Sequence, residues 1–440
     1  MDYSHSTNIN LLGLSFSILM AFLLIVLPRR HATIPIFMLA CFMTFGQRIN
    51  FAGLNLYMLR LLILAGLCRI IFRKNLFPIN FNSIDKFIII WVVSNIVIFT
   101  LLRQNFAAFI NRLGFAFNVL GIYFVFRFLI YDFNEIERVF RYIVFFLIIF
   151  AFVLSIEYFT QRNFFSVFGG VPQITDIRDG ELRCRGSFRH PILTGTFGAI
   201  FLPLVVWLWF DEEKKRRLLS IFLFFAVTFI VIASGSSGPV ATYMCGLLGL
   251  AIWPYRRNMK VIRLTVFLGL ISLHFYMKAP IWFLMDRVSG LLGGGTGGYR
   301  SRIIDQAIKH FNEWWLLGTD YTVHWTERAI RADPKMSDIT NMYIRQGVDG
   351  GLLTLILFII VIVKCFLAIG NTLEKMEEQP LSKRLIVWSM GVMLFAHCVT
   401  FLSVTYFDQS IVFFYMLLAL ISTVSRASLF KKDNVIKVNN

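Results

Sequence analysis

The chain has 440 residues, of which 57% are hydrophobic and only 15% are charged, a balance far from that of soluble domains. Apolar runs of about 17–25 residues recur along the whole sequence, each long enough to cross a hydrocarbon core of about 30 Å. This excludes a separate soluble domain and predicts one integral membrane domain over residues 1–440. The formal net charge of +18 comes from basic residues dispersed among short loops, which argues against nucleic acid as a partner.

The apolar runs predict an all-α fold, a bundle of roughly 12 or 13 transmembrane helices. Three polar residues, Arg127, Glu157 and His274, fall within these runs and need partners inside the bundle. The predicted spans are 9–28, 32–47, 55–73, 84–102, 108–131, 140–160, 191–210, 218–234, 238–254, 261–279, 349–370, 384–403 and 409–425.

Lysine and arginine concentrate in every second connection, which assigns those connections to the cytoplasm. The parity agrees along the chain and places the N-terminus outside and the C-terminus inside. The basic connections are Arg29/Arg30, Arg73/Lys74, Arg138/Arg141, Lys214 to Arg217, Arg256 to Arg263, Lys375 to Arg384 and Arg426 to Lys432.

Two connections on the opposite side are much longer than the rest, residues 161–190 and 280–348. The second shows helical patterning over 300–315 and 338–347. Long ordered loops are more often functional than decorative, so we expect the functional residues in these two periplasmic loops.

Both long loops carry arginine in preference to lysine, against the usual bias for this side of a membrane. The planar guanidinium suits bidentate capture of phosphate or carboxylate. The bland alternative is a solvated face or contact with anionic lipid headgroups. The arginines are Arg162, Arg178, Arg183, Arg185, Arg189, Arg287, Arg300, Arg302, Arg328, Arg331 and Arg345.

The glycine-rich stretch 290–298 precedes Tyr299-Arg300-Ser301-Arg302 and a predicted helix, whose first N–H groups could bind an anion. The alternative is a flexible hinge. Trp314 and Trp315 follow at the end of this helix and are interpreted as interfacial anchors, or else as platforms for sugar stacking.

Helical spacing aligns Asp338, Asn341 and Arg345 on one face just before a predicted span. A carboxylate, an amide and a guanidinium on one face could orient an acceptor hydroxyl and a phosphate. An intrahelical ion pair, or an N-cap in the case of Asp338, explains the same residues equally well.

The sequence resembles the O-antigen ligase and polymerase family of bacterial membrane proteins over about residues 160–425. Three segments carry the resemblance: Arg183-Cys184-Arg185-Gly186-Ser187-Phe188-Arg189-His190-Pro191; Arg300-Ser301-Arg302 ahead of Trp314 and Leu316-Leu317-Gly318-Thr319; and Thr340-Asn341 with Gly351 and Thr354. Family ligases have histidine at the position of Thr340. Its absence favours a polymerase over a ligase.

The resemblance implies a GT-C-like, inverting glycosyltransferase that needs neither a metal ion nor a cofactor, and no Asp-x-Asp metal motif occurs in the long loops. The donor would be a glycan on undecaprenyl pyrophosphate. Its pyrophosphate would be bound by Arg183, Arg185, Arg189, Arg300 and Arg302.

The acceptor would be a saccharide or the lipid A core, held by Thr340, Asn341 and Arg345. A general base must lie within hydrogen-bond reach of the acceptor hydroxyl. Asp338 is the preferred base and His324 the next candidate, with Arg302 as a catalytic electrostatic group.

The expected function is therefore an O-antigen or exopolysaccharide polymerase in the bacterial inner membrane, with its active site facing the periplasm and a chain-length regulator as a further partner. An O-antigen ligase is the first alternative. A transporter or flippase of lipid-linked sugars is the second, although no internal repeat of the kind common in transporters is visible. A channel or scaffold whose arginines contact only lipid is the third.

Overall fold

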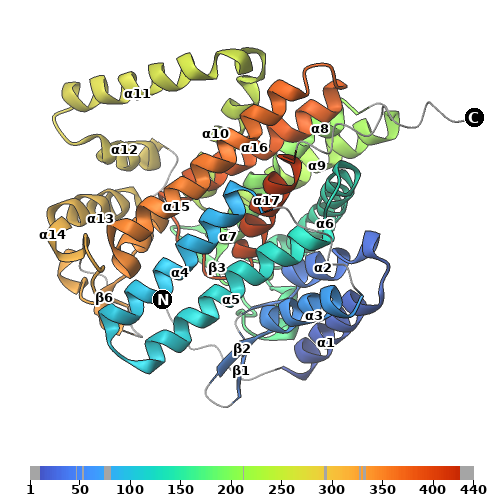
Figure 1. The fold of residues 1–440 in the computed structure, drawn as a ribbon, viewed down its shortest axis with the longest axis horizontal. Coiled ribbons are helices and arrows are strands. Elements are labelled where there is room, and N and C mark those ends of the chain that lie inside the picture. The colour runs from blue at the N-terminus through green and yellow to red at the C-terminus, as the bar shows by residue number, and fades with distance from the viewer. Residues whose placement is uncertain are drawn as a thin grey trace, which may run out of the picture.

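The computed structural model describes residues 10–45, 47–51, 54–73, 81–211, 213–291, 295–326, 329–330 and 333–426. The fold is mainly helical, as predicted, and long helices running side by side form its body (Figure 1). Eight segments of the described chain are long and apolar enough to cross a membrane. They comprise α4 (Ser83–Arg103), α5 (Phe106–Leu129), α6 (Phe133–Thr160), α7 (Pro191–Phe201) with α8 (Pro203–Trp209), α9 (Lys214–Ala233), α11 (Met259–Tyr276) with the 3₁₀ turn Trp253–Asn258, α15 (Met342–Lys375) and α16 (Leu381–Phe401).

Further apolar helices coincide with the remaining predicted spans. Three of them have lengths just below a full crossing: α1 (Leu11–Val26), α10 (Ser237–Ala251) and α17 (Ser410–Val424). The other two are α2 (Ile34–Phe42) and α3 (Met58–Phe72). With nine residues, α2 rises only about 14 Å. It cannot cross a bilayer alone, so the predicted span 32–47 is not one transmembrane helix.

The connections separate into two groups at opposite ends of the bundle. At the end that carries the two long loops, called the loop end below, hydrogen bonds join Thr44 to Gly169, Ser187 to Cys41, Arg189 to Asp408 and Asn341 to Leu402. At the other, basic end, contacts join Arg29 to Leu129, Asn82 to Ser422 and Arg257 to Glu377.

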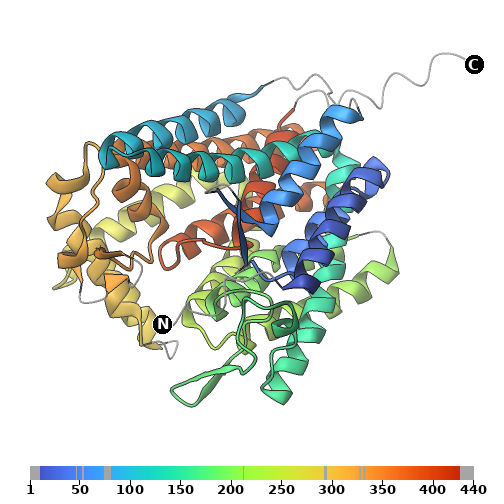
Figure 2. The same ribbon diagram turned by 90° about the horizontal axis from the view of Figure 1, so that it is seen from below.

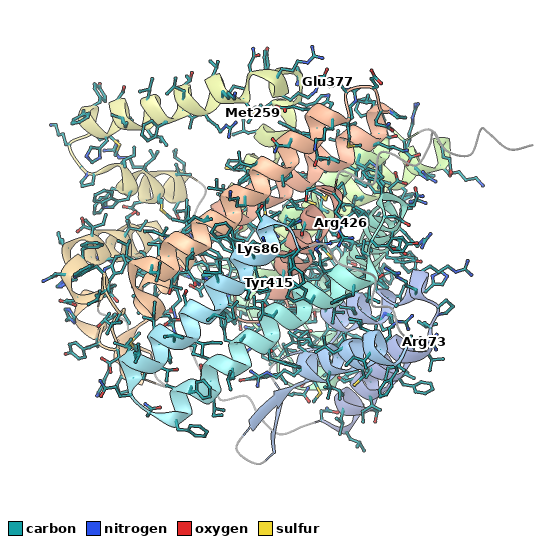
Figure 3. All side chains as sticks on the ribbon, viewed as in Figure 1. Arg73, Lys86, Met259, Glu377, Tyr415 and Arg426 are labelled. Atoms are coloured by element: carbon teal, nitrogen blue, oxygen red, sulfur yellow. The ribbon has the colours of Figure 1, made fainter. Side chains whose placement is uncertain are left out.

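Each of these contacts joins two residues that lie in connections, or at the ends of predicted spans, that the charge pattern assigns to the same side. Arg73, Glu377 and Arg426, from three of the predicted basic connections, lie away from the long loop that contains α13 and α14 (Figure 3). These contacts are consistent with the alternation of sides predicted from charge.

A buried ion pair closes the basic end between α4, α5 and α17. The Arg127 guanidinium donates to both oxygens of Asp85, at 3.0 and 2.9 Å, and both side chains are fully buried. Tyr123 and Ser422 donate to the same carboxylate. Arg127, expected to need a partner within the bundle, therefore has one contributed by the start of α4.

α4 and α5 run side by side, as the two views agree, and α15 packs against α4 (Figures 1 and 2). α11 differs from the other long helices, because none of its residues is buried and it lies apart from the bundle in Figure 1. An apolar helix exposed along its whole length is consistent with contact to lipid rather than to protein.

The second long loop contains α12 (Leu284–Leu291), α13 (Gly297–Lys309), α14 (Phe311–Trp314) and the 3₁₀ turns Ile281–Phe283 and Val323–Trp325. It has a small core of its own, in which Tyr299, Ile303, Trp314 and Trp325 pack with Val348 of α15. The helix predicted from residue 300 is present, whereas the one predicted from 338 begins at Met342. Trp314 is a core residue, so it serves neither as a lipid anchor nor as an open sugar platform, while Trp315 is exposed.

Three two-stranded antiparallel hairpins were not expected from the sequence, and all lie in connections. They are β1 (Arg48–Phe51) with β2 (Leu54–Tyr57), β3 (Asp176–Arg178) with β4 (Glu181–Arg183), and β5 (Ala329–Ile330) with β6 (Asp333–Ser337). Arg328, Arg331 and part of the glycine-rich stretch fall outside the described residues.

α15 contains a kink at two glycines, and the second long loop fills it. Gly351 has φ 68° and ψ −176°, a conformation almost confined to glycine. The kink frees the carbonyl of Val348, which accepts from the Thr319 N–H at 2.9 Å, and the N–H of Leu352, which donates to the Trp315 carbonyl at 2.8 Å. The turn after α14 thus replaces helix hydrogen bonds that the kink removes.

Substituting Gly351→Ala should destabilise the protein by about 1–3 kcal/mol from backbone strain alone. A Cβ atom at this position would in addition collide with the carbonyl oxygen of Leu316. Gly370→Ala in the same helix is the matched control, since nothing lies within 4 Å of its added Cβ. It should stabilise the helix by up to about 1 kcal/mol. Thermal unfolding of the detergent-purified variants measures both, and equal midpoints would contradict the role assigned to Gly351.

Candidate anion-binding site

The first long loop is fixed to the bundle by the carboxylate of Glu157 on α6. Its two oxygens accept the backbone N–H groups of Arg185 at 3.1 Å and Gly186 at 2.8 Å, and Thr175 donates to the same carboxylate at 3.3 Å. Glu157, predicted to need a partner inside the bundle, thus has three. This fixes the backbone of the segment that carries the predicted pyrophosphate-binding arginines.

Two of these arginines are held by neighbouring polar groups. The Arg183 guanidinium is buried and donates to the Ser236 hydroxyl at 2.9 Å. The Arg185 guanidinium pairs with Asp176 of β3 and donates to the Arg189 carbonyl at 3.1 Å. The hairpin β3–β4 also brings Arg178 to this place, where it pairs with Asp179 at 3.4 Å.

Arg300 reaches the same place from the second long loop. Its Nη1 atom lies 3.7 Å from the position that a Cβ atom at Gly238 would occupy, so the guanidinium lies against the first turn of α10. Ser236 precedes this helix, and no side chain caps its N-terminus. The N-terminus of a 15-residue helix therefore lies in the same region as the guanidinium groups.

Arg178, Arg183, Arg185 and Arg300 form what is called the arginine cluster below. All four act electrostatically on His190, the N-cap residue of α7. Burial and then these charges lower the pKa of His190 to about 3. Its Nδ1 accepts the Ile192 N–H at 3.2 Å, so the neutral ring carries its proton on Nε2. His190 is therefore a hydrogen-bond donor near neutral pH and not a general base.

Positive charge in the cluster exceeds negative charge. Asp176 and Asp179 pair with Arg185 and Arg178, but within the described chain no carboxylate contacts Arg300. Burial, and then the charges of Arg178 and Arg183, lower the pKa of Arg300 to about 10, which still leaves it charged at neutral pH. A half-buried guanidinium beside like charges is expected where an anion binds.

A short segment between α16 and α17 connects the cluster to other predicted site residues. Ser403, like Arg300, lies next to Gly238 of α10. Its hydroxyl oxygen is 3.3 Å from the position that a Cβ atom at Gly238 would occupy. Two residues on, Thr405 donates to the Ile339 carbonyl at 2.9 Å. Residues 338–341 therefore border the neighbourhood of the cluster.

Asp338 and Thr340 both occur at this border. The Tyr299 hydroxyl donates to the Asp338 carbonyl at 2.7 Å, which holds the Asp338 main chain against the first turn of α13, next to Arg300. The Asp338 side chain is exposed. The Thr340 hydroxyl oxygen is buried and has no hydrogen-bond partner in the described chain.

Asn341 and Arg345, predicted to bind the acceptor, have structural partners. Asn341 caps α15 by accepting from Tyr343 and Ile344 and donates to the Leu402 carbonyl at 3.2 Å. Arg345 pairs with Asp349 at 3.0 Å, and Arg112 of α5 pairs with the same carboxylate at 3.1 Å. The cap of α15 is thus Asn341 and not Asp338, and the intrahelical ion pair of Arg345 is formed with Asp349 and not with Asp338.

Arg302 and His324 do not join the cluster. Arg302 is exposed on α13, about 200° around the helix from Arg300, and it makes no hydrogen bond or ion pair with a described residue. His324 lies at the far side of the loop, where it contacts Glu313 at 3.1 Å. The structure thus favours Arg300 over Arg302 as the arginine from this helix.

Three members of the site were not selected from the sequence. Arg178 was one of many loop arginines, His190 was part of a motif without a role, and Asp408 lay in a short connection. The Asp408 carboxylate accepts the Arg189 N–H at 3.2 Å, and it accepts the N–H and the hydroxyl of Ser410, each at 3.1 Å. A carboxylate between two apolar spans is the one signal that could have indicated it.

Burial raises the pKa of Asp408 from 3.8 to about 6. Between these values the folded protein binds a proton that the unfolded chain has released, so stability should fall by on the order of 3 kcal/mol as the pH rises from about 4 to above 6. We expect Asp408→Asn, which cannot ionise, to lose this decline. Thermal midpoints of both proteins between pH 5 and 7.5 test this, and parallel curves would contradict it.

Comparisons with known proteins give no assignment. The chain matches no protein-family model, and a search of curated proteins finds no match. Its function must therefore be argued from the arginine cluster and its surroundings.

Proposed function

We propose that this protein is a glycosyltransferase of the bacterial inner membrane that transfers a glycan from undecaprenyl pyrophosphate to a saccharide acceptor, as an O-antigen or exopolysaccharide polymerase. In this proposal the loop end of the bundle faces the periplasm. The observation that supports it most is Arg300, half-buried beside Arg178 and Arg183 with no carboxylate against it in the described chain. A doubly charged phosphate ester would supply the missing negative charge.

The position of the cluster suits a lipid-linked donor. It lies where α7 and α10 begin, at the loop end of helices whose apolar surfaces belong in the bilayer. A polyprenyl chain could remain in lipid while its pyrophosphate meets the guanidinium groups. A soluble anion would need no such location.

The proposed reaction is a direct displacement. The acceptor hydroxyl oxygen forms a bond to the anomeric carbon as the bond from that carbon to the pyrophosphate oxygen breaks, with inversion, and a base takes the hydroxyl proton. Negative charge grows on the departing pyrophosphate. Arginines placed in advance at that charge stabilise the transition state more than the ground state.

Two further residues complete this scheme. His190 is neutral and can donate from Nε2 without adding another positive charge. Asp338 is the proposed base, because its main chain is held against the first turn of α13, which contains Tyr299 and Arg300. The Asp338 residue is exposed to the aqueous phase, from which the acceptor would arrive.

Arg300→Gln should reduce glycan transfer by at least about 100-fold, since a donor to the growing charge is lost. Arg302→Gln, two residues away on the exposed face of α13, is the matched control and should retain transfer. The readout is electrophoresis of lipopolysaccharide and secreted polysaccharide from a deletion strain carrying each variant, with membrane insertion verified by immunoblot. The reverse result would return the role to Arg302, as the sequence alone indicated.

Asp338→Asn keeps the size of the side chain but removes its basicity, and it should slow transfer by about 10²–10⁴-fold. Asp320→Asn is the control, because Asp320 is another carboxylate of the same loop, paired with Arg103 at 3.7 Å. Full transfer by the Asp338 variant would exclude it as the base.

The deletion strain also separates polymerase from ligase. A single repeat attached to the lipid A core, with loss of all longer chains, is the result expected for a polymerase. Loss of every attached repeat with long lipid-linked chains accumulating would indicate a ligase. Unchanged polysaccharide with lipid-linked units of every length would contradict both.

A further inference from the structure

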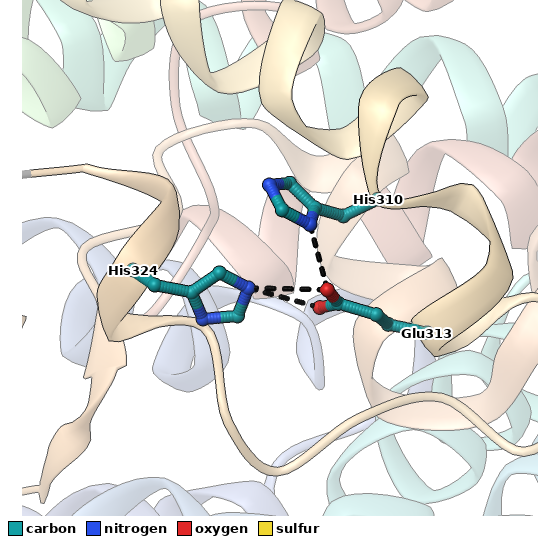
Figure 4. Close-up of side chains that lie close together, drawn as sticks. All are labelled: His310, Glu313 and His324. Atoms are coloured by element: carbon teal, nitrogen blue, oxygen red, sulfur yellow. Dashed lines mark hydrogen bonds and ion pairs between the residues drawn. The ribbon is translucent and has the colours of Figure 1, made fainter.

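A group of two histidines and a glutamate lies in the second long loop, outside the site described above. His310 Nδ1 is 2.6 Å from one oxygen of Glu313, and His324 Nε2 is 3.1 Å from the other (Figure 4). One potential ligand atom from each of the three side chains lies within 4.8 Å of the other two. His310 is half-buried, and Glu313 and His324 are exposed, so an ion could enter from solvent.

Neighbouring aromatic residues fix the orientation of the three side chains. The His324 ring stacks on Tyr321 at 5.1 Å, and the His310 ring stacks on Trp325 at 5.9 Å. Trp325 Nε1 also donates to Glu313 at 3.2 Å. Ligand orientation by such surrounding hydrogen bonds is typical of protein metal centres.

The donor atoms fit a divalent transition metal ion. Imidazole nitrogen and carboxylate oxygen bind zinc at about 2.0–2.2 Å, which in a tetrahedral site puts ligand atoms about 3.4 Å apart. The present separations bracket this value, so shifts of about 1 Å would complete the geometry. Three protein ligands leave a position for water.

We propose that His310, Glu313 and His324 bind one zinc-class divalent ion, with water in the remaining position. The ion would connect the end of α13 and the start of α14 to the 3₁₀ turn at Val323, across fourteen residues of loop. His310 is ten residues from Arg300, or about 15 Å along α13, so the ion takes no part in glycan transfer. The inference does not rest on the proposed function.

The sequence contains the pattern His-x-x-Glu followed eleven residues later by His. The other explanation of the geometry is a hydrogen-bonded network of two imidazoles on one carboxylate. That network needs no ion, so binding measurements separate the two.

The full-length protein should be purified in detergent with a histidine-free affinity tag, stripped with a chelator and titrated with Zn²⁺. We expect one zinc per chain by mass spectrometry of the bound metal, and visible absorption of a low-symmetry, four- or five-coordinate site when Co²⁺ is used. His310→Ala and His324→Ala should abolish stoichiometric binding. Trp325→Phe should weaken binding about 10-fold, since it removes the supporting hydrogen bond to Glu313 and keeps an aromatic ring beside His310.

The matched control is His274→Ala, because His274 is an exposed histidine on α11 away from the group. It should bind zinc as the parent protein does. Glu313→Gln can still hydrogen-bond both histidines, so its folding should persist while zinc affinity falls at least about 100-fold.

Zinc should also raise the thermal midpoint of the parent protein and leave that of His324→Ala unchanged. The proposal is overturned if the parent protein binds no zinc at micromolar concentration, or if the His310 and His324 variants bind it as tightly as the parent.

Discussion

The arrangement of the loop end depends on one buried carboxylate, that of Glu157. A backbone segment that turns back at the end of a helix bundle must satisfy its N–H groups, since each one buried without a partner costs a few kcal/mol. Glu157 accepts two adjacent N–H groups, those of Arg185 and Gly186. The segment can therefore follow only one path, which leads from β4 to His190 and puts Arg183 beside Ser236. The position of the arginine side chains thus depends on a backbone path that the Glu157 carboxylate fixes.

The remaining parts of the site are held by the same kind of interaction. Gln409 donates to the carbonyls of Met43 and Ser187, and Asp408 accepts from Arg189, so the connection before α17 is fixed to the first long loop. The second long loop is fixed through the kink of α15, where its backbone replaces missing helix bonds. Segments from four distant parts of the chain thus meet where helices begin or break. Those are the places where backbone groups need partners and where anions find free N–H groups.

The sequence was sufficient for most of the helices, because these follow from local apolar length. The sequence alone could not show which of the loop arginines belong to the site. Arg300 and Arg302 are two residues apart, and only the burial of Tyr299 and Ile303 against the loop core decides which one faces α10. Asn341 was predicted from its helical spacing to bind the acceptor, but its side-chain oxygen caps α15. Residues that share a motif can differ in role, because tertiary packing, which no local pattern contains, determines what they face. The three hairpins were not predicted, because their strands have only two to five residues, too few to show a periodic pattern.

α13 connects the two sites inferred for the second long loop, with Arg300 in its first turn and His310 as its C-cap residue. α13 begins at Gly297, and its buried face, Tyr299, Ile303 and Ala307, packs in the core of the loop. In the first turn of α13 the Tyr299 hydroxyl donates to the Asp338 carbonyl. In its last turn the Ala307 carbonyl accepts from the Trp314 indole N–H at 2.7 Å. With both ends attached, the helix cannot rotate without breaking one of these contacts, and Arg300 keeps its direction towards α10. A metal ion at His310 would restrain the same end that Trp314 already holds. The position of Arg300 therefore depends on the loop core, and substitutions in that core should affect anion binding without changing a residue of the arginine cluster.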